Sequence, residues 1–306
     1  MAVATSAAWL ASTSLVWRSN KASLRTCVVK KLGLVGVLVL NGGDEVLMRV
    51  AATLPHVLRV RTALFALQFD HPRLRAHRER ARPTCGMAQG RLCLHDGSTT
   101  IDLGEVAAMP LSVGCAAAYN VENIAAAALA AHGAGLPAAT IAATLATFGA
   151  RPGDNPGRLE RWPWRGATVL VDYAHNPDGL AQLLKVARAL APRRLLLLLG
   201  QAGNRDDGAI GHLAATAAGF APDLVVIKEL PGMLRGRALG AVPTLLREGL
   251  LRAGMPADRL VDEPDEEAAA RCLLEAGRDG DVVVLPIHTA AVRQRLAALL
   301  GDNPPR

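Results

Sequence analysis

The sequence predicts an α/β protein whose carboxy-terminal half is a doubly wound, mostly parallel, Rossmann-like sheet, preceded by a partial α/β domain. The first observation is periodicity: from about residue 158 onwards, apolar runs of strand length alternate with amphipathic stretches of helical period. The second is that these runs are nearly continuous in Leu and Val, which is typical of parallel strands covered by helices on both faces. The third is size and composition, because 306 residues with 51% hydrophobic but only 3% aromatic residues favour two domains with Ala, Leu and Val cores.

The second half, residues 151–306, shows the more regular pattern. A strand is predicted at Ala167–Val171, between Gly166 and Asp172, and apolar residues then recur at helical spacing up to Leu190. The alternation continues with strands at 195–199, 224–227, 260–261 and 282–285, and with helices at about 207–220, 242–253, 265–276 and 290–300. Because βαβ units are right-handed, these strands are expected to form one parallel sheet with helices on both faces.

The first half, residues 32–150, is less regular. A buried strand is predicted at 35–40, followed by a helix over about 45–53, and residues 90–103 alternate around Asp96-Gly97 as in a hairpin. Two Ala-rich helices are predicted over 120–134 and 137–148, where small side chains permit close packing. The turn-rich stretch 151–157 marks the predicted domain boundary.

The net charge of +7 is concentrated at the amino terminus. Residues 1–43 contain five of the 34 basic residues and no acidic residue, so the other 263 residues carry a net charge of only +2. No nucleic-acid interface is therefore predicted. The basic segment 1–31 fits either a transit peptide or an anomalous start without a role, and no apolar run reaches the ~20 residues of a membrane span. The five scattered cysteines, without a CxxC pair, favour free thiols and a cytoplasmic protein.

Polar residues gather where two predicted strands end. The run Asp172-Tyr-Ala-His-Asn-Pro177 follows one strand, and the Gly-containing loop 200–207 follows the next. Ligands of open parallel sheets bind beyond the carboxyl ends of the strands, and a helix that starts at Pro177 would present free N–H groups to an anion. Arg205 would offer a positive fork to a phosphate or carboxylate. Each residue alone also has an ordinary explanation as a helix cap, a surface pair or a packing residue, so the six-residue order is the more specific signal.

That order resembles the Mur ligase family, whose ATP-dependent members join an amino acid to a carboxylate through an acyl phosphate and release ADP. The resemblance includes Gly157-Arg158 and the Asn120-Val-Glu-Asn123 segment. Within the family, three segments most resemble the carboxy-terminal half of cyanophycin synthetase, which polymerises aspartate and arginine: 41–44, 155–158 and 228–237.

The resemblance implies a role for each matching residue. Asn120 and Asn123 would lie near the adenine, Arg158 would contact the nucleotide, and Asp172 would bind the ribose hydroxyls. His175 and Asn176 would lie beside the reacting phosphate as catalytic residues. The incoming carboxylate or the transferred phosphate would be held by three arginines, Arg205, Arg235 and Arg237. ATP and Mg²⁺ are the implied cofactors, and an amino acid and a carboxylate acceptor are the implied substrates.

Several family features have no counterpart in this sequence. The only lysines are at positions 21, 30, 31, 185 and 228, so no Gly-rich GKT/S loop exists to hold phosphates. The family's magnesium-binding carboxylate and histidine and its modified lysine are also missing, Tyr119 stands where the family often has His, and Asn204 stands where it often has Asp. We therefore expect the chain to begin inside the central ATPase domain and not to form the acyl phosphate alone.

Three functional hypotheses follow. In the first, the chain is a Mur-type ligase, either residual or completed by a second copy or a partner chain. In the second, it is a non-catalytic module that binds a nucleotide or an amino acid. In the third, it is an inactive truncated product with exposed strand edges. A dinucleotide-dependent oxidoreductase is disfavoured because no GxGxxG follows a strand, and a hydrolase is disfavoured because there is no GxSxG.

Overall fold

A computed structural model describes residues 37–53 and 62–302. The basic segment 1–31, Cys27 and the first residues of the strand predicted at 35–40 lie outside the described residues. The chain divides into two compact units, Met1–Ala150 and Arg151–Arg306, and each is described by itself. None of the described helices is long and apolar enough to cross a bilayer.

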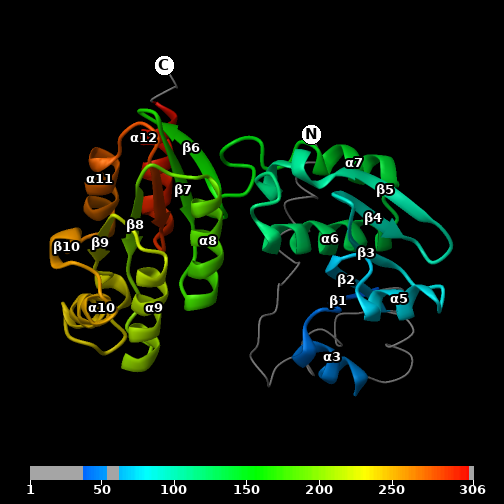
Figure 1. The fold of residues 1–306 in the computed structure, drawn as a ribbon, viewed down its shortest axis with the longest axis horizontal. Helices are drawn as coiled ribbons and strands as arrows, with labels where there is room; N and C mark the ends of the chain where they lie inside the picture. The colour runs from blue at the N-terminus through cyan, green and yellow to red at the C-terminus, as the bar shows by residue number, and fades with distance from the viewer. Residues whose placement is uncertain (1–36, 54–61, 303–306) are drawn as a thin grey trace. The chain divides into compact units, whose positions relative to one another are not determined.

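The first unit contains a five-stranded sheet in the order β1-β2-β3-β4-β5 (Figure 1). Strands β1 (Leu38–Asn41), β2 (Thr62–Gln68) and β3 (Thr84–Ala88) are parallel, whereas β4 (Arg91–His95) and β5 (Thr100–Glu105) add an antiparallel hairpin. Helices α6 (Ala118–Gly133) and α7 (Ala138–Leu145) pack on one face, and α3 (Glu45–Ala52) and α5 (Pro72–Arg78) contribute to a smaller core on the other. The predicted hairpin is confirmed, and the strand predicted at 35–40 and the helix predicted at about 45–53 correspond to β1 and α3.

The sequence pattern did not predict β2, α5 and β3. The β2 sequence Thr62-Ala-Leu-Phe-Ala-Leu-Gln68 is a short apolar run, and periodicity alone does not separate a buried strand from a helical turn in such a run. Parallel pairing with β1 and β3 makes it the central parallel strand. The first unit is therefore more regular than its sequence indicates.

The second unit contains a six-stranded sheet in the order β10-β9-β8-β11-β7-β6, as the prediction of a doubly wound sheet requires. Its parallel strands are β7 (Ala167–Asp172), β8 (Leu195–Leu199), β9 (Leu224–Lys228), β10 (Leu260–Glu263) and β11 (Val282–Pro286). Its helices are α8 (Pro177–Ala189), α9 (Asp207–Gly219), α10 (Ala241–Arg252), α11 (Glu266–Ala276) and α12 (Ala290–Gly301). The predicted α/β class and strand–helix alternation are confirmed.

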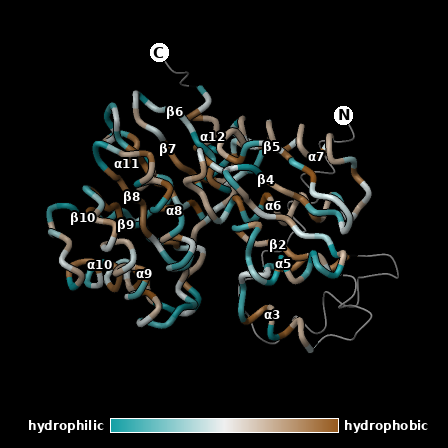
Figure 2. The backbone as a smooth tube through the Cα atoms, turned by 45° about the vertical axis from the view of Figure 1, so that its right-hand side comes forward, coloured by the Kyte–Doolittle hydropathy of each residue, from teal (hydrophilic) through white to brown (hydrophobic). Residues whose placement is uncertain are grey.

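Two groups of helices cover this sheet. Buried side chains of α11 and α12 pack with those of β7, β8 and β11 in one core, and α8, α9 and α10 cover the other face (Figure 1). Figure 2 shows hydrophobic segments along β7 and β8. The Leu195–Leu199 strand is buried at every residue, which explains its unbroken leucine run.

Strand β6 (Glu160–Trp164) was not predicted and runs antiparallel to β7 at one edge of the sheet. It contains Pro163, which has no backbone N–H and is therefore confined to edge strands or bulges. The Trp164 side chain is buried, and its Nε1–H donates to the carbonyl of Leu274 over 2.9 Å. This edge strand brings residues 157–160 beside the carboxyl end of β7.

Candidate functional site

Asp172 is the last residue of β7 and lies at the carboxyl edge of the sheet. Its Oδ2 atom accepts a hydrogen bond from the backbone N–H of Leu159 over 2.8 Å, and Gly157 and Leu159 have left-handed φ angles of +70° and +50° that turn this loop. Burial raises the pKa of Asp172, while the Leu159 hydrogen bond and the charge of Arg158 act in the opposite direction. The carboxyl group is thus partly desolvated at the strand end.

Two arginines flank the ring of Tyr173. The guanidinium carbon of Arg158 lies 5.3 Å from the ring centroid, and that of Arg293 lies 5.4 Å from it. Arg293 also donates to the carbonyl of Ile287 over 3.0 Å. Cation–π contacts of this kind orient a guanidinium without neutralising its charge. The arrangement therefore places two positive groups beside Tyr173, the residue next to Asp172, and Arg293 was not singled out by the sequence.

His175 and Asn176 follow on the same segment. The exposed His175 ring has Nδ1 3.1 Å from the carbonyl oxygen of Tyr173. Asn176 caps α8, because its Oδ1 accepts from the backbone N–H of Gly179 over 2.8 Å and Pro177 occupies the first turn. The structure thus gives Asn176 a capping role, and that role uses its side-chain oxygen.

The loop after β8 is held by Arg237. Its guanidinium donates to the carbonyls of Gly203 over 3.0 Å and Arg205 over 2.6 Å, and it pairs with the Asp207 carboxylate at 2.7 Å. Arg205 itself is exposed, and Arg235 is exposed in a turn with a left-handed φ of +50°. Arg237 is engaged in holding this loop, whereas the side chains of Arg205 and Arg235 are the ones presented to solvent.

Asn120 and Asn123 lie on α6 of the first unit. The Nδ2 atom of Asn120 donates to the carbonyl of Leu111 over 2.9 Å, and its Oδ1 accepts from Nδ2 of Asn123 over 3.2 Å. The two residues therefore contact each other, and the hydrogen bond to Leu111 ties the start of α6 to the preceding segment.

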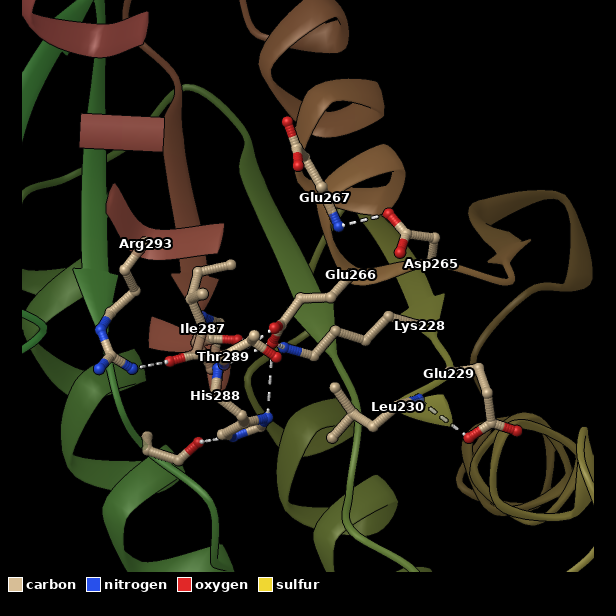
Figure 3. A network of polar contacts seen from close by, with 12 residues as sticks. Lys228, Glu229, Leu230, Asp265, Glu266, Glu267, Ile287, His288, Thr289 and Arg293 are labelled. Carbon is tan, nitrogen blue, oxygen red and sulfur yellow. Dashed lines mark hydrogen bonds and ion pairs between the residues drawn. The ribbon is translucent and has the colours of Figure 1, made fainter. Parts of the chain in front are cut away.

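A buried ionic network lies at the carboxyl edge of the sheet, and it was not predicted from the sequence (Figure 3). The Lys228 side chain at the end of β9 is fully buried, and its Nζ donates to Glu266 Oε1 over 2.6 Å and to the carbonyl of Pro286. Glu266 Oε1 also accepts from the backbone N–H of His288 over 2.7 Å, and Oε2 accepts from that of Thr289 over 2.9 Å. One carboxylate thus joins the ends of β9 and β11 to the start of α11.

The protonation of this network follows from burial and charge. Burial lowers the pKa of Lys228 to about 8, although the Glu266 charge acts to raise it. Burial alone would raise the pKa of Glu266, but the charge of Lys228 and the hydrogen bonds that Glu266 accepts lower it to about 2. Burial, together with the nearby Lys228, lowers the pKa of His288 to about 4. At neutral pH the carboxylate is therefore ionised and the His288 imidazole is neutral.

The donor sets differ in how well they fit the implied cofactors. A strand-end carboxylate such as Asp172 is suited to accept ribose hydroxyls, and Arg158 and Arg293 are suited to a phosphate. Among residues 37–53 and 62–302, by contrast, no group of three or more His, Cys, Asp or Glu side chains is arranged to hold a metal ion. The described residues therefore fit part of a nucleotide but do not form a magnesium site by themselves.

Comparison with known proteins identifies the second unit. Residues 157–286 match the family of Mur ligase glutamate ligase domains. The chain is also 27% identical over 271 residues to cyanophycin synthetase of Crocosphaera subtropica, an alignment that covers 88% of this chain and 30% of that protein. The sequence resemblance to Mur ligases and to cyanophycin synthetase is thereby confirmed.

A second relative, a ligase with a different name, is similar to this chain over a shorter stretch. The UDP-N-acetylmuramoyl-L-alanyl-D-glutamate–2,6-diaminopimelate ligase of Geobacillus kaustophilus is 32% identical over 210 residues, which is 68% of this chain and 38% of that protein. The chain thus spans about a third of the length of these curated relatives.

Solved structures show the same fold. Folylpolyglutamate synthase of Thermotoga maritima superposes with a TM-score of 0.55 at 15% identity, covering 87% of this chain and 54% of that chain. Folylpolyglutamate synthase of Mycobacterium tuberculosis, solved in complex with ADP, superposes with a TM-score of 0.54 at 19% identity, covering 88% and 56%.

Proposed function

We propose that this chain is part of an ATP-dependent carboxylate–amine ligase of the Mur ligase and cyanophycin synthetase type. In that reaction a substrate carboxylate attacks the γ-phosphate of ATP, forming an acyl phosphate and releasing ADP. An amine then attacks the acyl carbon, the C–N bond forms, and inorganic phosphate leaves. In this proposal the second unit holds the nucleoside end of ATP and the incoming amino acid.

The cluster at the end of β7 carries this proposal. The partly desolvated carboxylate of Asp172 accepts hydrogen bonds from the ribose hydroxyls, and hydrogen bonds of a desolvated carboxylate are stronger than those in water. Arg158 and Arg293, held against Tyr173, supply positive charge next to it. The exposed Arg205 and Arg235 are available for the carboxylate of the amino acid.

The phosphoryl-transfer step needs groups that this sequence does not contain. Phosphate-binding loops of the GKT/S kind hold phosphates with backbone N–H groups and a lysine, and no such motif occurs in the 306 residues. We therefore propose that turnover requires this loop and the magnesium ligands to be supplied from outside these 306 residues. The same observation favours a second candidate, a module that binds nucleotide or amino acid without turnover.

Calorimetry of the purified chain tests both candidates. ADP and ATP are titrated into the wild type, into Asp172→Asn, and into the control Asp258→Asn, whose residue is exposed and lies directly before the amino end of β10. Asn keeps an acceptor for the Leu159 N–H but loses the charge, so we expect weaker nucleotide binding in Asp172→Asn alone. Absence of both nucleotide binding and amino-acid binding in the wild type would refute both candidates. Both candidates predict no ADP release from this chain alone. ADP release from ATP once a polypeptide with a GKT/S loop is added, tested with a panel of amino acids, would favour the ligase, and its absence would favour the module.

A further inference from the structure

Two buried side-chain atoms in the described part of the chain have no hydrogen-bond partner, Oε1 of Gln201 and Nδ1 of His288. The Gln201 residue is 6% exposed and the His288 residue is 7% exposed. An unsatisfied buried acceptor costs about 1–3 kcal/mol, so native proteins rarely keep one without a reason. Gln201 follows β8 and His288 follows β11, and these are neighbouring strands whose carboxyl ends lie at the same edge.

The other polar atom of each side chain is engaged, and that engagement makes both orphan atoms acceptors. Gln201 Nε2 donates to the carbonyl of His175 over 3.3 Å, which leaves Oε1 to accept. His288 Nε2 lies 3.1 Å from the carbonyl oxygen of Ala174, and only a protonated Nε2 donates to a carbonyl, so Nδ1 of the neutral ring carries a lone pair. Because Ala174 and His175 are consecutive, both side chains are anchored to one short segment beside Asp172.

The groups around His288 fix its position and keep it neutral. Its backbone N–H donates to Glu266, and Nδ1 lies 3.8 Å from Glu266 Oε1, which is too far for a hydrogen bond (Figure 3). Lys228 neutralises the Glu266 carboxylate, and the edge of the His288 ring also meets Tyr173, with centroids 5.6 Å apart. Burial, the positive charge of Lys228 and the nearby His175 disfavour a second proton on the ring, whereas the Glu266 charge favours it, and the net effect keeps Nδ1 unprotonated.

We propose that Nδ1 of His288 and Oε1 of Gln201 accept hydrogen bonds from the primary amine of the incoming amino acid. This inference rests on the proposed ligase function and assigns the amine end of its substrate. A neutral primary amine has two N–H donors and one lone pair, so two acceptors orient it and leave the lone pair free to attack. The C–N bond then forms as the C–O bond to phosphate breaks, and the proton lost by nitrogen leaves with the phosphate; His288 and Gln201 take no proton.

Nitrogen-15 NMR of the histidine side chains tests this in the full wild-type chain. Each of the twenty amino acids is added at millimolar concentration, with and without ADP, and then the Nα-trimethylated form of any that binds. We expect at least one amino acid to move the Nδ1 signal of His288 upfield, as hydrogen bonding to a lone pair does, and its trimethylated form, which has no N–H, to leave the signal in place. If no amino acid moves the signal, or if the trimethylated form moves it equally, the assignment is wrong.

A matched pair of variants tests Gln201 by calorimetry. Gln201→Met removes the acceptor, and Gln294→Met makes the same change at an exposed position of α12. We expect amino-acid binding to weaken about tenfold or more in the first variant and less than twofold in the second. Equal affinity in wild type and Gln201→Met would overturn the inference. ADP binding is measured in parallel to separate the two proposals. If ADP does not bind, the proposed nucleotide site is wrong. If ADP binds but no amino acid moves the Nδ1 signal of His288, the amine site alone is wrong.

Discussion

Breaking the buried Lys228–Glu266 pair is the most demanding test of the network at the carboxyl edge. Lys228→Met removes an ammonium that lies 2.6 Å from a carboxylate, and both side chains are at most 4% exposed. Glu266 then keeps its two backbone donors, His288 and Thr289, but loses its compensating charge. Removing one partner of a buried pair typically destabilises by about 3–5 kcal/mol, and we expect that magnitude here.

Amide hydrogen exchange of β9 and β11 along a urea series is the suitable measurement, because a chain with two compact units need not unfold in one transition. Lys228→Met/Glu266→Gln is expected to recover about 1 kcal/mol, since Gln leaves no unpaired charge and its single oxygen still accepts from one of the two backbone groups. Arg295→Met is the control in the same unit, because Arg295 on α12 pairs with Glu267 at 2.6 Å and its side chain is 55% exposed. That change should cost about 0–1 kcal/mol, and an equal loss in Lys228→Met would refute the reasoning.

Three further predictions concern the same edge. Gly203→Ala should destabilise the second unit by about 1–3 kcal/mol, because the new Cβ would lie 2.0 Å from the Leu234 carbonyl oxygen. Gly211→Ala is the control on helix α9, where the new Cβ meets nothing within 4 Å, and it should stabilise the unit by about 0.5–1 kcal/mol. Equal urea midpoints for the two variants would contradict this reasoning. Because Asn176 caps α8, Asn176→Ala should lower the free energy of unfolding by about 1 kcal/mol, whereas Asn176→Asp, which keeps a capping oxygen, should change it little. Thermal denaturation of the two variants measures this difference. The folded-state pKa of His288, about 4, lies below its ordinary value near 6.5, so the unfolded chain binds its proton first as pH falls. The wild type should therefore lose up to about 3 kcal/mol between pH 6.5 and pH 4, with full stability above that window; a pH series in which His288→Gln loses as much would exclude this cause.

The second unit was predicted closely because each strand is an almost unbroken apolar run and each helix is amphipathic. Helix α11 begins at Glu266, one residue after the predicted start, because Asp265 serves as its cap and accepts from the backbone N–H groups of Glu267 and Ala268. In such cases local sequence and tertiary packing favour the same structure, and periodicity is then sufficient.

The site was less predictable because its contacts join distant segments. Lys228, Glu266 and His288 come from three separate strand–helix boundaries, and a lysine after a strand is ordinarily solvated. In the folded unit Lys228 is a buried cation, because its Nζ donates to Glu266 at the start of α11 and to the carbonyl of Pro286 at the end of β11. Arg293 is one of many arginines in the sequence, and nothing in its helical surroundings distinguishes it before the fold places it beside Tyr173.

The proline in the edge strand β6 bears on how this molecule meets its neighbours. A sheet edge ordinarily offers a row of backbone N–H and C=O groups to any extended chain that approaches it. On β6, Pro163 interrupts that row, and the flanking Trp162 and Trp164 pack against the core instead of outward. A further strand is therefore poorly accommodated at this edge, and any second chain that joins the molecule there is expected to do so through side chains and not by extending the sheet.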